Sequence, residues 1–184
     1  MKSLTGILFG SFLLIGTTLS LCAQTNTKMR EVGLNMTTLL SQVVPFNRTG
    51  TLIGPYQMNY IYLSPKNRGF RFSLGGQISE VFQDRSHINV LFGFERRKWI
   101  GDKERFSFRR GTNLFISVGG LQTPLVDSNN LTLFGIAIAR GIEYHLAPGI
   151  GISTEAFFHL GINSDGFLEM HITPPFAINL NVKF

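Results

Sequence analysis

The chain has 184 residues, of which 43% are hydrophobic and 15% are charged, and its formal net charge is +6. This composition excludes an intrinsically disordered protein, which combines low hydrophobicity with high charge. A single Cys excludes an internal disulfide framework. The length is that of one domain. Lys and Arg are only in modest excess and form no basic stripe on a recognition helix, so we expect no nucleic-acid partner.

Residues 1–23 have the layout of a secretory signal peptide. Lys2 precedes an apolar stretch that gives way to small and polar residues. We expect cleavage after Ala23. The alternative is a lipoprotein acylated at Cys22, although the Leu before that Cys is larger than a lipoprotein signal prefers. The apolar stretch is shorter than the ~20 residues of a membrane-spanning helix, which argues against a retained membrane anchor. After cleavage we expect one domain, at 24–184.

Residues 24–184 alternate between apolar and polar or small residues over most of their length. A period of two is typical of β-strands whose two faces meet different surroundings. The alternation predicts eight strands, at 31–42, 55–63, 69–80, 87–98, 105–120, 131–146, 149–163 and 174–184. Most of these are close to the ~9–11 residues that a tilted strand needs to cross a membrane.

The connections between these strands alternate in length. We expect tight turns at 64–68, 101–104 and 147–148, and mostly longer connections at 45–54, 81–86, 121–130 and 164–173. Such alternation is typical of a membrane barrel with one end in the periplasm and the other outside the cell. An even number of strands also returns the C-terminus to the side of the N-terminus.

The last strand has the strictest alternation. Its apolar face consists of Phe176, Ile178, Leu180, Val182 and Phe184. This strand resembles the C-terminal assembly signal of bacterial outer-membrane barrels. The whole of 24–184 resembles the small eight-stranded barrels of the OmpA and OmpX type, and in particular the group described as outer membrane protein beta-barrel domain.

The resemblance implies an all-β fold, an eight-stranded antiparallel up-and-down transmembrane β-barrel in the cell outer membrane. Both termini would be periplasmic. The implied partners are outer-membrane lipid and the barrel assembly machinery, which would bind the C-terminal strand. We expect no peptidoglycan-binding domain after the barrel, so the resemblance does not imply the anchoring role of OmpA.

Charged residues on the inward face are expected to pair. A sheet that spans lipid has to close, because its edge groups would find no water. Eight strands leave an interior just wide enough for side chains. Buried charges are tolerable there only when they are paired and hydrogen-bonded. We therefore predict an ion-pair belt inside the barrel, formed by Arg71, Glu95, Arg97, Arg109, Glu143 and Glu155.

Two other arginines, Arg110 and Arg140, fall on the outward positions of their strands. An outward Arg at the midplane of a barrel costs ~2–4 kcal/mol, and less near the interface. Arg110 is close enough to a strand start to reach the interface, whereas a β-bulge near Arg140 would turn that side chain inward. The sequence leaves both orientations open.

Aromatic residues near strand ends, among them Tyr56 and Trp99, are expected at the membrane interfaces.

No catalytic constellation is evident. Ser153 and His159 both face inward on the predicted strand 149–163, but the ~3.3 Å rise per residue places them ~20 Å apart. His87 and His171 fall beside the longer connections, where we expect ordinary solvated side chains. The sequence also lacks a P-loop, a dinucleotide-binding fingerprint and a zinc-protease motif. We expect no enzyme activity, no cofactor and no metal.

The predicted function is that of a non-enzymatic integral outer-membrane barrel with a filled lumen. Its role would be structural in the envelope, or a contact with an extracellular ligand through the longer loops. Apolar residues in those loops could extend strands or bind a partner: Leu52, Ile53, Leu125, Val126, Phe167, Leu168 and Met170. Three alternatives remain open: a lipid-modifying enzyme, a narrow channel or transporter, and a soluble barrel that binds a hydrophobic ligand.

Overall fold

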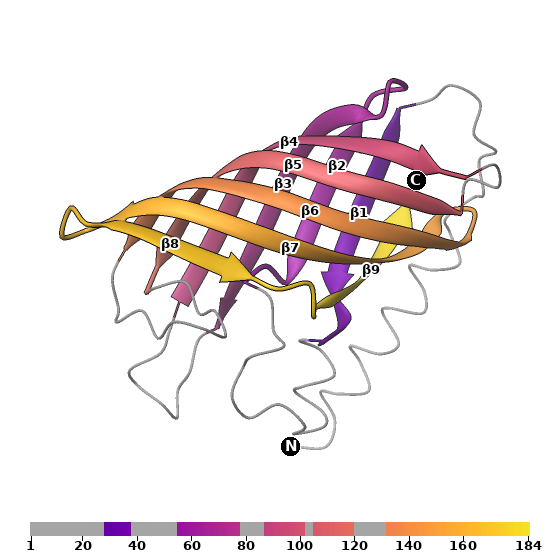
Figure 1. Ribbon diagram of the computed structural model, residues 1–184. Coiled ribbons are helices and arrows are strands. Elements are labelled where there is room, and N and C mark those ends of the chain that lie inside the picture. Colours follow the sequence, from indigo (N-terminus) through magenta and orange to yellow (C-terminus); the bar gives the residue numbers. More distant parts are fainter. Residues whose placement is uncertain (1–27, 38–54, 78–86, 102–104, 120–131) are drawn as a thin grey trace, which may run out of the picture.

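The described strands form one closed antiparallel barrel (Figure 1). This computed structural model describes residues 28–37, 55–77, 87–101, 105–119 and 132–184. The predicted signal peptide at 1–23 and the loop residues Leu52, Ile53, Leu125 and Val126 lie outside the described residues.

The barrel has eight strand positions and nine strand segments. The segments are β1 (Met29–Asn35), β2 (Met58–Leu63), β3 (Arg68–Gln77), β4 (His87–Ile100), β5 (Phe106–Val118), β6 (Leu133–Ala147), β7 (Ile150–Asn163), β8 (Leu168–Thr173) and β9 (Ile178–Lys183). From β1 to β7, each strand pairs with the next in the chain, and β9 pairs with β1 to close the barrel. The predicted all-β, up-and-down fold is confirmed.

The eighth position is divided between β8 and β9. The second half of β7 pairs with β8 and its first half pairs with β9. Pro174 and Pro175 separate the two segments, because proline has no N–H to donate to a ladder. The figure shows β8 lying along β7 and β9 lying beside β1.

The predicted long connection at 164–173 is therefore wrong. A tight turn takes its place, in which the side-chain oxygen of Asn163 accepts hydrogen bonds from the backbone N–H groups of Asp165 and Phe167. Gly166 supplies the positive φ that this turn needs. The strand resumes at Leu168, and Leu168 and Met170 face outward on β8 rather than lying in a loop.

The stagger of the barrel follows from its register. Starting at Gly33 on β1 and passing through β2 to β6, the paired residues lead to Gly161 on β7. In the other direction, through β9, Gly33 leads to Gly151. The two positions are ten residues apart on β7. This offset of ten residues is the shear of the barrel. With a rise of ~3.3 Å per residue and a strand spacing of ~4.8 Å, it tilts the strands by about 40° from the barrel axis.

The two faces of the wall differ as the alternation predicts. Large apolar side chains face outward and are exposed, including Phe92 at 51%, Leu114 at 64% and Phe134 at 61%. The residues between them face the interior, where charged and polar side chains are buried. On the last strand, Ile178 and Phe184 are exposed whereas Asn181 and Lys183 are buried.

Within the described residues, no helix is long and apolar enough to cross a membrane.

Closure between β1 and β9 can be tested by a cross-link. Val32 and Val182 are register partners on the outer face, and directly opposite residues have Cβ atoms ~4.5–5.5 Å apart. We expect the V32C/V182C variant, made in a C22S background, to form an intramolecular disulfide on mild oxidation. Non-reducing gel mobility and peptide mass spectrometry would detect it.

The matched control pairs Val32 with Ile178, which lies on the same face of β9 but four residues away. The V32C/I178C variant should remain unlinked, because ~13 Å separates the two positions along the strand. Equal linking in both variants would contradict the register.

Candidate functional site

The six predicted interior charges come together inside the barrel, and two further residues join them. Glu31 on β1 and Lys183 on β9 complete a set of four cations and four carboxylates, all of which are buried. We call these eight residues the interior network: Glu31, Arg71, Glu95, Arg97, Arg109, Glu143, Glu155 and Lys183.

Arg97 contacts three carboxylates from three strands. Its Nη2 lies 2.7 Å from Glu31 Oε1, and its Nε lies 3.0 Å from Glu95 Oε1. Its Nη1 lies 2.9 Å from Glu143 Oε2. Because five N–H donors in a planar fork can serve several carboxylates at once, Arg97 links β1, β4 and β6 across the lumen.

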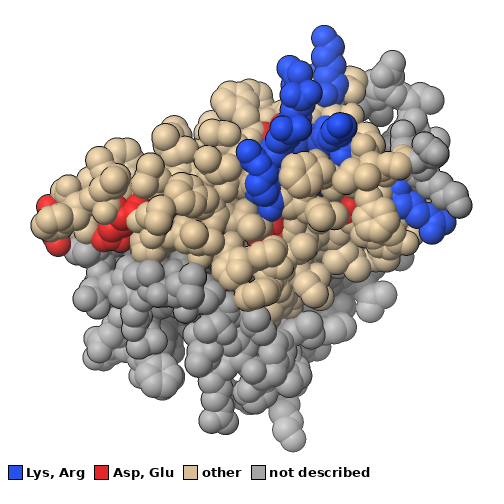
Figure 2. Space-filling view, in the orientation of Figure 1, with Lys and Arg blue, Asp and Glu red and all other residues tan. Residues whose placement is uncertain are grey.

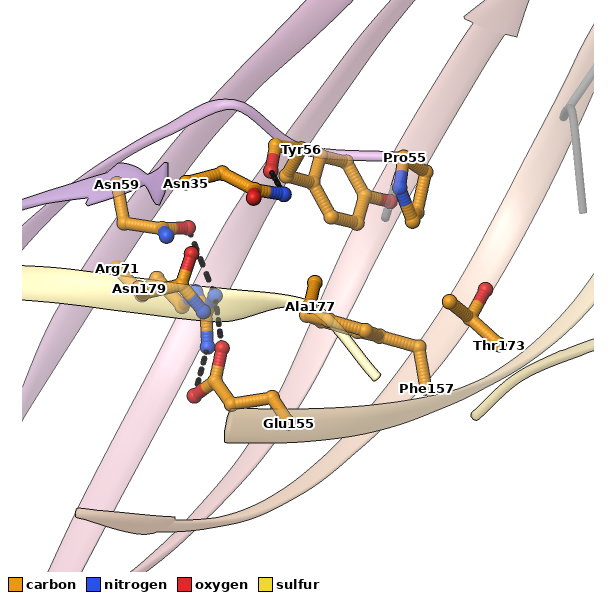
Figure 3. A pocket seen from close by; sticks show the side chains of 10 residues that line it. All are labelled: Asn35, Pro55, Tyr56, Asn59, Arg71, Glu155, Phe157, Thr173, Ala177 and Asn179. Atoms are coloured by element: carbon orange, nitrogen blue, oxygen red, sulfur yellow. Dashed lines mark hydrogen bonds and ion pairs between the residues drawn. The ribbon is translucent and has the colours of Figure 1, made fainter. Parts of the chain in front are cut away.

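Arg71 and Arg109 extend the network towards β7. Arg71 makes a two-pronged pair with Glu155, in which Nη1 and Nη2 donate to the two carboxylate oxygens at 2.8 and 2.6 Å (Figure 3). Its Nη2 also donates to Asn59 Oδ1 at 2.8 Å. Arg109 Nε lies 3.1 Å from Glu95 Oε1 and 3.2 Å from Glu155 Oε1.

Small residues make room for these large side chains. Gly141 on β6 pairs in register with Glu155, and a Cβ at Gly141 would lie 2.6 Å from Glu155 Cγ. A Cβ at Gly151 would lie 2.4 Å from Glu143 Oε1. Ala137 and Ala139 are further small inward residues of β6, and both are buried. Gly141 and Gly151 thus leave space for the carboxylate side chains of the network.

The end of the barrel near the C-terminus is covered by Lys183, His145 and Trp99. Lys183 Nζ lies 2.9 Å from Glu143 Oε1 and 2.6 Å from His145 Nδ1. The Trp99 ring packs on His145 with centroids 4.6 Å apart, and Lys183 Nζ lies 6.0 Å from the Trp99 centroid. Trp99 therefore occupies an inward position and is half-buried, which differs from the predicted interface placement.

Beyond the network, the other half of the lumen contains a cluster of buried apolar side chains, which lie among buried polar residues such as Asn89, Asn113 and His159. We call this group the apolar plug; it consists of Tyr56, Leu91, Phe115, Leu133, Ala137, Ala139 and Phe157. The Tyr56 hydroxyl lies 3.1 Å from His159 Nε2, and the edge of Phe115 meets the His159 ring. The prediction that Tyr56 lies at a membrane interface is wrong, because only 3% of this residue is exposed.

The two histidines predicted to be solvated also face the interior. His87 is 8% exposed and His171 is 2% exposed. His171 Nε2 lies 2.9 Å from Glu169 Oε2 on the same strand. The prediction is wrong because β8 extends into the segment taken for a loop, and β4 begins at His87 itself.

Among the described residues, no group of three or more His, Cys, Asp or Glu side chains could hold a metal ion.

Ser153 and His159 belong to different parts of the lumen. Ser153 Oγ accepts hydrogen bonds from Arg109 Nη1 at 3.1 Å and from Asn181 Nδ2 at 2.9 Å. His159 lies in the apolar plug with Tyr56. Ser153 therefore serves the interior network, and the geometry does not join it to His159 as a nucleophile and base.

The space between the interior network and the apolar plug is small. A cavity of about 10 Å³ lies there, lined by Asn35, Asn59, Arg71, Glu155, Phe157 and five further residues (Figure 3). This is room for about one water molecule.

Arg110 and Arg140 face outward. Both are exposed, and β5 pairs Arg110 directly with Arg140 on β6. The register shift of β6 lies between His145 and Ala147, so no bulge at Arg140 turns it inward. The alternative left open by the sequence is thus resolved in favour of the outer face.

A scan against protein-family models gives no match for the chain, and a search of curated proteins finds no significant relative.

Removal of Arg97 should destabilise the barrel strongly. The R97A variant leaves Glu31, Glu95 and Glu143 short of a partner, and breaking a buried ion pair from one side costs about 3–5 kcal/mol. We expect a loss of that size in the free energy of unfolding, measured by denaturant titration with Trp99 fluorescence and circular dichroism.

The neighbouring Lys98 provides the control, since it is exposed on the opposite face of β4. The K98A variant should change the free energy of unfolding by less than about 0.5 kcal/mol. Similar losses in the two variants would show that the network contributes no more than a surface charge.

Proposed function

We propose that the protein is an integral outer-membrane β-barrel with a closed lumen, with a structural role in the envelope or a role in contacts at the cell surface. One observation carries the proposal: the barrel is inverted relative to a water-soluble protein, with charges at its centre and an apolar coat on its outside. The proposal rests on this inversion together with the sequence resemblance.

The apolar coat runs around the whole wall. Exposed large apolar side chains occur on every strand from β2 to β9. A soluble monomer rarely exposes a contiguous apolar area of this extent. Lipid is the solvent that suits such a surface, and a closed barrel satisfies the backbone groups that lipid cannot.

The proposed orientation places the termini in the periplasm. The turns at 64–67 and 148–149 lie at the end of the barrel where Phe184 exchanges backbone hydrogen bonds with Arg30. Short turns are typical of the periplasmic end, although the short turn at 164–167 lies at the opposite end. On β9, the outward residues Ile178, Leu180 and Val182 would then face lipid, and the same face would be presented to the assembly machinery.

The filled lumen favours a closed barrel over a channel. The interior network and the apolar plug occupy successive levels of the lumen, with room for about one water between them. Ser153 and His159 lie apart in the lumen. Ser107 Oγ does lie 3.3 Å from His145 Nε2, but His145 Nδ1 faces Lys183 Nζ at 2.6 Å, where a catalytic triad would place its orienting carboxylate. We therefore retain the structural and surface-contact roles.

Fractionation and gel mobility test the membrane location. We expect the protein in the outer-membrane fraction, released by detergent but not by high salt. We also expect faster gel migration of unheated samples than of boiled ones, because a folded barrel is more compact than its denatured chain. Recovery in the soluble periplasmic fraction without a heat-dependent shift would overturn the proposal.

Planar-bilayer recording tests the closed lumen. Purified wild-type protein should produce no current steps, because the lumen is filled at both levels. An F115A/F157A variant removes two rings of the apolar plug, one of which packs against Arg71, but keeps every charged residue of the interior network, and it should also be silent. Open-channel currents from the wild type would favour the channel instead.

A further inference from the structure

Four arginines form a continuous row on the outside of the barrel. The register pairs Arg68 with Arg96, Arg96 with Arg110, and Arg110 with Arg140. All four are exposed. The row thus crosses β3, β4, β5 and β6 at right angles to the strands, over about 14 Å. Figure 2 shows blue side chains gathered on this face, over β4 to β6.

The arginine row has no acidic partner on the described strands. Every carboxylate of those strands lies at an inward position: Glu31, Glu95, Glu143, Glu155 and Glu169. The guanidinium of Arg140 instead donates to the carbonyl of Ala139 at 2.9 Å. Inside the barrel, by contrast, each Arg contacts at least two carboxylates.

Such a row is unfavourable unless an anion binds to it. Like charges directly opposite each other on neighbouring strands repel. Three adjacent pairs of this kind occur here in succession. A bound anion would turn the repulsion into attraction, and Arg presents a planar fork of donors that fits phosphate oxygens.

The row borders a hollow in the outer wall. The hollow has a volume of about 260 Å³ and is lined by all four arginines together with Thr112, Phe94 and Glu95. The carboxylate of Glu95 itself pairs with Arg97 and Arg109 inside the barrel. Gly69 and Gly111, whose positions face inward, also border it. The wall therefore offers both donors and space at the same place.

An apolar surface adjoins the row on one side. Phe70 and Phe94 each lie two residues from an arginine of the row, with ring centroids 5.1 Å apart, and Phe92 continues the group. A ligand that fills the hollow and contacts these rings needs a phosphate and a hydrocarbon chain. This combination is the chemistry of a phospholipid and not of a free anion.

We propose that Arg68, Arg96, Arg110 and Arg140 bind the phosphate of an anionic phospholipid on the outer wall of the barrel. The proposal rests on the membrane location proposed above, which would place Arg68 near the periplasmic interface, beside the turn at 64–67. The strand tilt raises the row by about 9 Å from β3 to β6. The long side chain of Arg140 would reach back towards the head groups.

Native mass spectrometry of the full chain in non-ionic detergent tests the proposal. The protein is titrated with phosphatidylglycerol, with phosphatidylcholine of the same acyl chains, and with inorganic phosphate. The R96Q/R110Q/R140Q variant should bind phosphatidylglycerol at least about tenfold more weakly than the wild type, since charge-assisted hydrogen bonds are lost. Phosphatidylcholine should bind both proteins equally weakly, and inorganic phosphate should displace little lipid.

The matched control removes three exposed cations outside the row, in the K28Q/K66Q/R105Q variant. Its affinity for phosphatidylglycerol should stay within about twofold of the wild type, because a site depends on geometry and not on net charge. The R96K/R110K/R140K variant keeps the charge but loses the planar fork. It should bind with intermediate affinity.

Three results would overturn the proposal: undiminished binding by the Gln variant, an equal loss in the control variant, or displacement of the lipid by inorganic phosphate at equal concentration. The last would indicate a site for free anions. This titration does not depend on where the protein lies in the cell. Fractionation therefore reports on the proposed location, and the titration reports on the arginine row.

Discussion

The narrow bore of an eight-stranded barrel is the constraint on which the rest of the structure depends. Inward side chains from all strands converge on one axis, so each has to be satisfied by the others and not by bulk water. Four cations and four carboxylates meet this demand in one half of the lumen, and a mixture of apolar groups and neutral polar groups such as Asn89 and Asn113 fills the other. The glycines at Gly141 and Gly151 follow from the same constraint, because a side chain there would displace a glutamate.

Much of the wall could be predicted from the sequence, since a period of two assigns each residue to a face once a strand is located. The six predicted network residues were found in this way. Glu31 and Lys183 share the parity of Gly33 and Asn181, so the same rule could have found them. The wrong predictions concern segments in which the alternation of apolar and polar residues is interrupted. The break at Pro174 hid β8, and with it the inward position of His171.

The placement of Tyr56 and Trp99 shows a second limit. An aromatic residue near a strand end suits either a membrane interface or the mouth of a narrow barrel, and its type does not distinguish them. The inward placement of each aromatic side chain depends on the residues it contacts inside the barrel. These are His159 for Tyr56, and His145 with Lys183 for Trp99. Those partners are over 40 residues away in sequence. Strand order and stagger bring them together, and neither can be read from a local pattern.

The division of the eighth strand by Pro174 and Pro175 leaves only a short ladder where the barrel closes. The ladder that joins β9 to β1 has five register pairs, whereas the ladder between β6 and β7 has fourteen. The shorter ladder joins the two ends of the barrel, so it carries the largest loop-closure entropy and forms late. Mechanical or chemical unfolding should begin along the same line and run outward from it.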